Sequence, residues 1–170
     1  MEEALNLLSD RILNDDISTN SYVKNFRNSN VQKLEQHLES NNILTTEQFG
    51  FRKGVHTENA VFSLTNNIIT SLNQRQQVGG IFCDLTKAFD CVNHTILLSK
   101  LHYYGIRGKC HHWFKSYIEN RKQRVCTSPH VLEQEKSSSW ETVVSGVPQG
   151  SILGTLLFII YLNDLPYGLH

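Results

Sequence analysis

The stretch FCDLTKAFDCVNH, residues 82–94, decides how this chain is interpreted, because an apolar run ends there at an acidic residue and a helix signal follows. Residues 78–83 have the length and the apolar, β-prone composition that are typical of a buried strand. Asp84 stands at the C-terminal end of that predicted strand, where a carboxylate on rigid backbone suits a hard cation such as Mg²⁺. Asp90 is more typical of a helix cap or a surface acid than of a second metal ligand.

Helical periodicity flanks this stretch on both sides. Apolar residues recur every three or four positions in several segments, which predict amphipathic helices over residues 4–13, 31–38, 57–77 and 96–104 and around residues 113–118. Residues 125–131 and 140–144 predict a β-hairpin, and residues 153–162 predict a buried helix. Polar residues 14–21 predict a linker.

Composition and charge exclude several classes of protein. The chain has 170 residues and 19.5 kDa, which suits one domain or a piece of a larger one. Lys+Arg and Asp+Glu are 16 each, so the chain is neither a histone-like polycation nor an acidic disordered tail. The longest apolar stretch, residues 152–162, is shorter than the roughly 18 residues of a membrane span, so we expect no membrane association.

Targeting and redox signals are weak. The N-terminus is acidic where a secretory or mitochondrial leader would be basic, so we expect a nuclear or cytoplasmic protein that is not secreted. Four cysteines contain no C-x-x-C pair. We therefore expect reduced thiols and no cysteine-based metal site.

Basic side chains dominate residues 100–124, where Glu119 is the only acid. Tyr103, Tyr104, Trp113 and Tyr117 are interleaved with them. This pattern fits a surface that follows nucleic-acid phosphates, and it equally fits a solvated helix face with core aromatics behind it. The basic residues are Lys100, Arg107, Lys109, Lys115, Arg121, Lys122 and Arg124.

Two glycine-containing segments could bring backbone close to a ligand. EQFGFRKG, residues 47–54, places Arg52 and Lys53 between glycines. SGVPQGS, residues 145–151, presents the amide of Gln149 beside Gly150. On local sequence alone, each segment is more typical of a plain turn.

Together these motifs resemble the reverse transcriptases of non-LTR (LINE, Jockey-like) retrotransposons. Residues 82–94 resemble motif A, and SGVPQGSILG with the following FIIYLNDLP, residues 145–166, resembles motif B. Residues 47–54 are similar to a fingers motif, and YGIRG with the later WF, residues 104–114, matches the segment between motifs A and B. The similarity runs from about residue 34 to residue 166 in the family's order, which is far more specific than a single motif.

The resemblance implies an α+β fold, a partial right-hand polymerase containing fingers and the first part of the palm, with helices packed on a small antiparallel sheet. It implies a divergent helix and linker in residues 1–30 and a partial reverse transcriptase domain in residues 31–170. Asp84 would be the catalytic, metal-binding aspartate, and the metal would be Mg²⁺ or Mn²⁺. The backbone of Leu85 would lie beside the same metal and the incoming triphosphate.

The resemblance also implies binding roles. Arg52 would contact nucleotide phosphates, and Phe89 would exclude a 2′-hydroxyl. Gln149 and Gly150 would line the nucleotide pocket. An RNA template, a DNA primer and a dNTP would be the ligands, and the missing palm and thumb would be a partner. The candidate nucleic-acid contacts are Lys53, Lys115, Arg121, Lys122 and Arg124.

The chain departs from the family pattern in its carboxylates. The family's next motif has an aromatic residue, one variable residue and two aspartates, whereas the adjacent aspartates of this chain are Asp15 and Asp16, in the wrong place. Two-metal phosphoryl transfer uses about two or three carboxylates. We therefore expect a domain truncated before that motif, with negligible polymerase activity alone. The alternatives are a noncatalytic nucleic-acid-binding module and an inert retroelement remnant.

Overall fold

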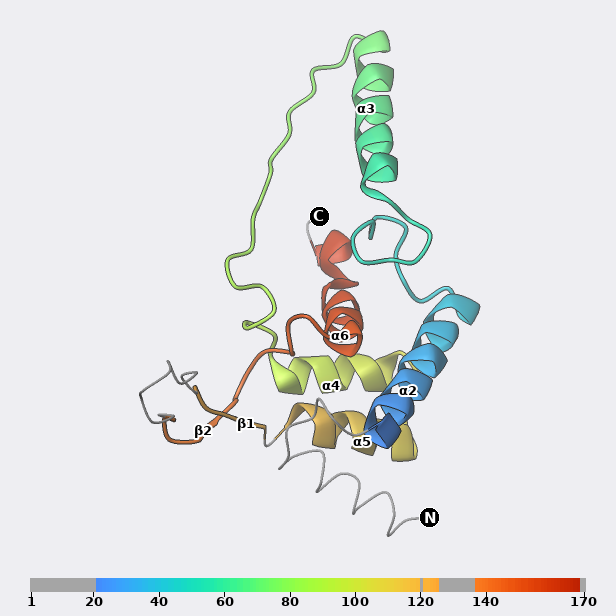
Figure 1. Ribbon diagram of the computed structural model, residues 1–170. Coiled ribbons are helices and arrows are strands. Elements are labelled where there is room, and N and C mark those ends of the chain that lie inside the picture. Colours follow the sequence, from blue (N-terminus) through green and yellow to red (C-terminus); the bar gives the residue numbers. More distant parts are fainter. Residues whose placement is uncertain (1–20, 120, 126–136, 169–170) are drawn as a thin grey trace.

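The computed structural model describes residues 21–119, 121–125 and 137–168 (Figure 1). Two short strands pair antiparallel, with Lys122 opposite Thr142 and Gln123 opposite Glu141. The elements in chain order are α2 (Ser21–Ser40), α3 (Thr57–Asn73), α4 (His94–Tyr103), α5 (Gly108–Ile118), β1 (Lys122–Gln123), β2 (Glu141–Thr142), α6 (Ile152–Leu162) and a 3₁₀ turn, η1 (Leu165–Gly168).

The core lies between helices. α6 packs against α2 and α4, and α4 also packs against α5. The sequence of α6, ILGTLLFIIYL, is apolar around almost its whole circumference, which explains why most of its residues are buried. Outside α6, the largest fully buried side chains are Leu38, Val92, Leu97, Leu101 and Ile118.

Capping residues set the helix ends that position the site. The Asn93 side chain accepts a hydrogen bond from the Ile96 N–H at 3.1 Å, so α4 begins at His94, slightly before the predicted helix of residues 96–104. The helix ends before Gly105, whose φ of +88° is a left-handed conformation that glycine adopts without strain. Ser151 caps α6 by accepting the Gly154 N–H at 2.9 Å.

The prediction of a buried strand over residues 78–83 is wrong. This segment is irregular and exposed, with 93% of Ile81 and 87% of Phe82 accessible to solvent. β-prone residues form a strand only when a neighbouring strand supplies hydrogen bonds, and none of the described segments pairs with this one. Asp84 consequently follows an exposed extended chain and not a strand end.

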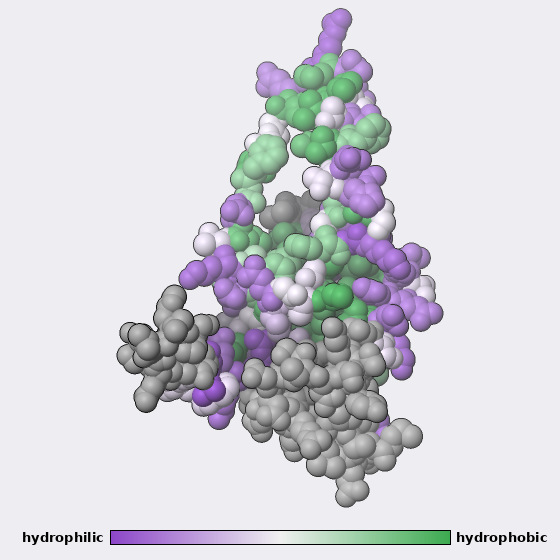
Figure 2. Space-filling model, viewed as in Figure 1, coloured by the Kyte–Doolittle hydropathy of each residue, from purple (hydrophilic) through white to green (hydrophobic). Residues whose placement is uncertain are grey.

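α3 forms where the sequence predicts it, but its apolar side is uncovered. None of its residues is buried, and Phe62, Val61 and Leu72 are each more than half exposed. In Figure 1 the helix stands apart from the other four and connects to α4 through the extended segment. Figure 2 shows apolar side chains gathered on this arm of the molecule.

Other boundaries differ from expectation. α2 begins at Ser21, well before the predicted helix of residues 31–38, and ends at Ser40 as predicted. The hairpin is confirmed as an antiparallel pair, but its first strand is Lys122–Gln123, and most of the predicted strand 125–131 lies outside the described residues. The helix predicted over residues 4–13 and the adjacent linker also lie outside them, apart from Ser21.

The fold class is α+β, with helices and one small antiparallel sheet. The helices pack on one another, and both strands are exposed, so the sheet is not the surface on which they pack. No helix within the described ranges is both long and apolar enough to cross a membrane.

Candidate nucleotide and nucleic-acid site

Hydrogen bonds join the segment after Asp84 to the loop before α6. The Val147 N–H donates to the Phe89 carbonyl at 2.9 Å, and the Gly146 N–H donates to the Val92 carbonyl at 2.8 Å. The Ser145 hydroxyl donates to the Asp90 carbonyl at 3.0 Å. These hydrogen bonds join residues 54–58 positions apart in sequence, so the backbones of the two segments that resemble motifs A and B are held side by side.

Gly146 makes this close approach possible. Its φ is +89°, and a Cβ atom there would lie 2.9 Å from the Asp90 Cα and 3.0 Å from the Asp90 carbonyl oxygen. On its other side, the Nε2 of the buried His94 donates to the Gly146 carbonyl at 2.8 Å. A residue with a side chain would separate the two segments, so this position requires glycine.

Aromatic rings bring a third segment to the same place. Phe89 stacks on Phe158 of α6, with ring centroids 4.4 Å apart and an interplanar angle of 25°. Phe51 meets the Phe89 ring edge-on at 6.1 Å. The turn before α3, the segment before α4 and the helix α6 thus converge on Phe89.

The Arg52 side chain, next to Phe51 in sequence, is held by a backbone contact. Its Nη1 donates to the Thr45 carbonyl at 3.0 Å. The Thr45 hydroxyl donates to the Glu47 carboxylate, and this hydrogen bond lowers the pKa of Glu47. The neighbouring Lys53 is exposed.

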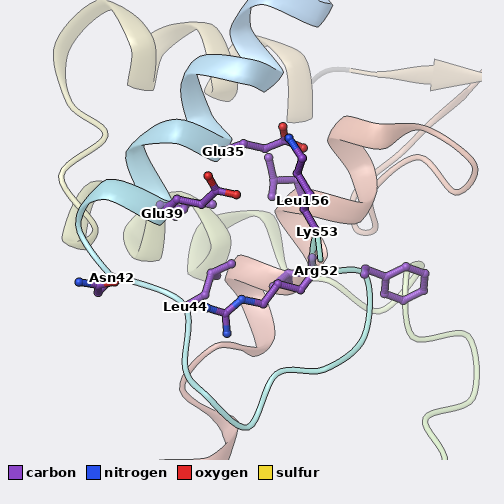
Figure 3. Close-up of a pocket in the computed structure, with 10 residues that line it drawn as sticks. Glu35, Glu39, Asn42, Leu44, Arg52, Lys53 and Leu156 are labelled. Carbon is purple, nitrogen blue, oxygen red and sulfur yellow. The ribbon is translucent and has the colours of Figure 1, made fainter. Parts of the chain in front are cut away.

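A small cavity lies under this turn, and Figure 3 shows Arg52 and Lys53 opposite Glu35 and Glu39 of α2 around it. Its volume is about 60 Å³. Ligand pockets typically measure about 300–1,000 Å³. The cavity is therefore too small for a nucleotide.

The remaining candidate residues are exposed. Asp84 and Leu85 lie on the extended segment, and Gln149 and Gly150 lie in the loop before α6. Gly150 has a φ of +81°, and no atom lies within 4 Å of the position that a Cβ would take. The structure thus brings together Phe51, Phe89 and the start of the 145–151 loop. Arg52 follows Phe51 in the same turn but contacts Thr45, and Asp84, Leu85 and Gln149 make no hydrogen bond that links them to this group.

The acids of the described part do not form a metal site. Across residues 21–119, 121–125 and 137–168, no three His, Cys, Asp or Glu side chains are close enough to share an ion. Asp84 is an exposed carboxylate on irregular backbone. A divalent ion that serves phosphoryl transfer needs several oxygen ligands on rigid backbone. This single exposed residue does not supply them.

The basic surface is only partly available to nucleic acid. Lys122 and Arg124 are exposed, and the Arg124 guanidinium lies 4.7 Å from the centre of the Trp140 ring. Lys115 is 4.0 Å from the Glu119 carboxylate. Arg121 is half-buried, and desolvation lowers the pKa of its guanidinium.

Three of the four aromatic residues interleaved with the basic residues of 100–124 pack toward the core. This agrees with the interpretation of that segment as a solvated helix face with core aromatics behind it. Tyr117 is buried, and Trp113 stacks on it with centroids 5.7 Å apart. Tyr104 is partly buried against the core, whereas Tyr103 is 81% exposed. The exposed aromatics of this region are therefore Tyr103 and Trp140.

Sequence reasoning missed several residues of the site. Phe158 and Phe51 gave no separate signal, because which rings meet Phe89 depends on how α6 and the turn pack. Gly146 was noticed only as part of a flexible loop. Asn163 had a usable signal, since it is a polar residue that directly follows a long apolar run and is 4% exposed.

The backbone-joined loops and the stacked Phe89 ring belong to the two segments that resemble reverse-transcriptase motifs A and B. Residues 17–170 match the family model described as reverse transcriptase (RNA-dependent DNA polymerase), and the chain belongs to this family. The resemblance to non-LTR retrotransposon enzymes is thereby confirmed at the level of the family and its relatives.

The curated relatives come from fly mobile elements. The chain is 34% identical over 141 residues to a probable RNA-directed DNA polymerase from transposon BS of Drosophila melanogaster, covering 79% of this chain and 14% of that protein. It is 32% identical to the probable RNA-directed DNA polymerase from transposon X-element of the same species, covering 76% and 13%. The RNA-directed DNA polymerase from mobile element jockey of Drosophila funebris is 32% identical, covering 79% and 15%.

The chain thus spans about a seventh of the length of these relatives. No solved structure matches it.

Proposed function

We propose that this chain forms the fingers and the first part of the palm of a right-hand polymerase, and that it works within a longer reverse transcriptase on an RNA template, a DNA primer and a dNTP. Residues 31–170 would form this partial domain. The observation that carries the proposal is the hydrogen-bonded junction of the Phe89 segment with the 145–147 loop. Two motifs of the family, separated in sequence, meet there as one surface.

Phe89 is the proposed selector of the sugar. Its ring is fixed between Phe158 and Phe51, so it cannot swing away from a nucleotide bound above it. A flat, immobile ring under the sugar excludes an extra 2′-hydroxyl by steric contact. Arg52, next to Phe51, would offset the negative charge of the triphosphate, and Gln149 and Gly150 would border the pocket from the loop.

Asp84 is the proposed metal-ligating carboxylate of the longer protein. Reverse transcriptases use divalent ions such as Mg²⁺. The described acids do not converge on an ion, so further carboxylates must come from outside this part of the chain. We therefore expect negligible primer extension by the 170-residue chain alone, and measurable Mg²⁺-dependent extension by it would contradict this expectation.

The test begins with the coding DNA downstream of residue 170. We expect an aromatic residue, one variable residue and Asp-Asp within the next few tens of codons. In a protein that includes this motif, Asp84→Asn should abolish primer extension on an RNA template. Asp90→Asn is the matched control, because Asp90 is an exposed acid of the same segment whose contacts here are made by its backbone. Equal activity of the Asp84 variant and the parent protein would overturn the assignment.

A second candidate function is nucleic-acid binding without catalysis. The exposed Lys122 and Arg124, with the Trp140 ring beside them, favour it. If the downstream motif is absent and the 170-residue chain still binds an RNA–DNA primer-template in a salt-dependent way, this second function is the better description.

A further inference from the structure

Asn163, at the C-terminal end of α6, joins three segments through its buried amide. Its Oδ1 accepts the Thr45 N–H at 2.9 Å. Its Nδ2 donates to the Ile43 carbonyl at 2.8 Å and to the Tyr104 hydroxyl at 3.1 Å. The amide has two N–H donors, and both are used.

One of these partners also holds Arg52. The Thr45 N–H is bound by Asn163, and the Thr45 carbonyl accepts from the Arg52 Nη1 at 3.0 Å. The peptide backbone of a single residue therefore connects the Asn163 side chain, at the end of α6, to the Arg52 guanidinium. Thr45 is itself buried, so water cannot easily substitute for either bond.

The orientation of Arg52 follows from this connection. A guanidinium carries five N–H donors in one plane, and the bond to Thr45 uses one of them. Fixing that donor restricts the directions in which the other donors can point, and it removes rotamer freedom that binding would otherwise have to remove. A displaced Thr45 carbonyl would release the guanidinium to solvent.

We propose that Asn163 is a positioning residue for Arg52: by holding residues 43–45, it orients the guanidinium toward the triphosphate of an incoming nucleotide. This inference rests on the proposed role of Arg52 in phosphate binding. Asn163 touches no nucleotide in this scheme and acts only through Thr45.

The experiment is a double-mutant cycle on the 170-residue chain, with inorganic tripolyphosphate as the probe and isothermal titration calorimetry at low salt as the measurement. Arg52→Ala should weaken binding at least about tenfold, the range for a lost hydrogen bond to a charged group. Asn163→Ala should weaken binding in the parent chain. It should have no further effect in the Arg52→Ala background, because both changes remove the same interaction.

Ile118→Ala is the structural control. Ile118 is buried in α5, away from this connection, so the variant loses stability but should keep its affinity per folded molecule. Tyr104→Phe is the milder companion variant if Asn163→Ala does not fold, because it removes one hydrogen bond of Asn163 and leaves the core intact. Its smaller loss of affinity should likewise vanish when Arg52 is alanine.

The outcomes separate the two proposals. If Arg52→Ala leaves the affinity unchanged, the phosphate-binding role of Arg52 is wrong, and the positioning role falls with it. If Arg52→Ala weakens binding but the Asn163 or Tyr104 change has no effect, or the same effect in both backgrounds, the positioning role alone is wrong. Hydrogen exchange of the Thr45 amide, which should accelerate in Asn163→Ala, confirms that the intended bond was removed.

Discussion

Gly146 and Gly150 differ in one respect that mutagenesis can isolate. Both have left-handed φ values, +89° and +81°, but an added Cβ would collide with the Asp90 backbone only at Gly146. Gly150→Ala should therefore cost about 1–2 kcal/mol of unfolding free energy from backbone conformation alone. Gly146→Ala should cost clearly more, because the two joined segments must also separate. Urea unfolding followed by circular dichroism measures both, and equal losses would contradict the close approach.

The Thr45 hydroxyl controls the ionisation of Glu47. Its hydrogen bond lowers the pKa of the carboxyl group, so Thr45→Val should raise that pKa toward its usual value. A depressed folded-state pKa adds stability above the unfolded pKa and loses it as pH falls through the folded pKa. In Thr45→Val this contribution, and with it the acid-side loss of stability, should become smaller, because the folded pKa moves toward the unfolded pKa. NMR titration of the Glu47 carboxyl carbon tests the prediction, and an unchanged midpoint would refute it.

Sequence reasoning at this scale succeeded where the signal is local. The helices that follow Asn93 and Ser151 were expected from local periodicity, and each begins at a short polar side chain that accepts an N–H of the first turn. The pairing of Phe89 with Phe158 could not be inferred in the same way. It depends on where α6 lies relative to a segment almost seventy residues earlier. The local sequence around Phe89 and the local sequence of α6 carry no information about that position.

Among the elements, α3 is the least covered. Because its apolar residues are exposed, replacing Ile69 by Ser should change the unfolding free energy by no more than about 0.5 kcal/mol, as at other surface positions. Leu101→Ala, at a fully buried position of α4, should instead cost about 2–5 kcal/mol. Chemical denaturation compares the two. A large loss for Ile69→Ser would mean that α3 is covered in solution.

The wrong prediction of a strand at residues 78–83 and the exposed apolar side of α3 have the same cause. Periodicity and β-propensity report that a segment suits burial, and they do not report whether a covering partner is present. The prediction for α3 was right about the helix, since helical hydrogen bonds are internal to it. The prediction for residues 78–83 failed, since the hydrogen bonds of a strand come from another segment.

For the whole molecule, zero net charge conceals an uneven distribution. Lys122 and Arg124 are exposed on one side of the hairpin, so nucleic-acid binding should weaken steeply as salt increases. Replacing both by Ala should reduce the slope of log affinity against log salt by about 1–2. Fluorescence anisotropy with a labelled RNA–DNA duplex measures that slope. Lys33→Ala, an exposed cation of α2, is the control that should leave it unchanged.

The sequence order of the motifs was sufficient to predict the family. It was not sufficient to predict the packing of helices on one another, because the expected sheet has only two short strands in the described part. The role of Asn163 was also out of reach. Its partners lie 59, 118 and 120 residues away, so no sequence window contains them together.

Those long separations have a consequence for synthesis on the ribosome. α2 and residues 43–45 are made early, but the amide that fixes them and the helix that buries α2 emerge only after α6 has been translated. Until then, the nascent chain must keep apolar surface of α2 and α4 unburied, and closing so long a loop is slow. We therefore expect folding to be delayed until α6 has left the exit tunnel, which makes chains arrested before it natural clients for chaperones.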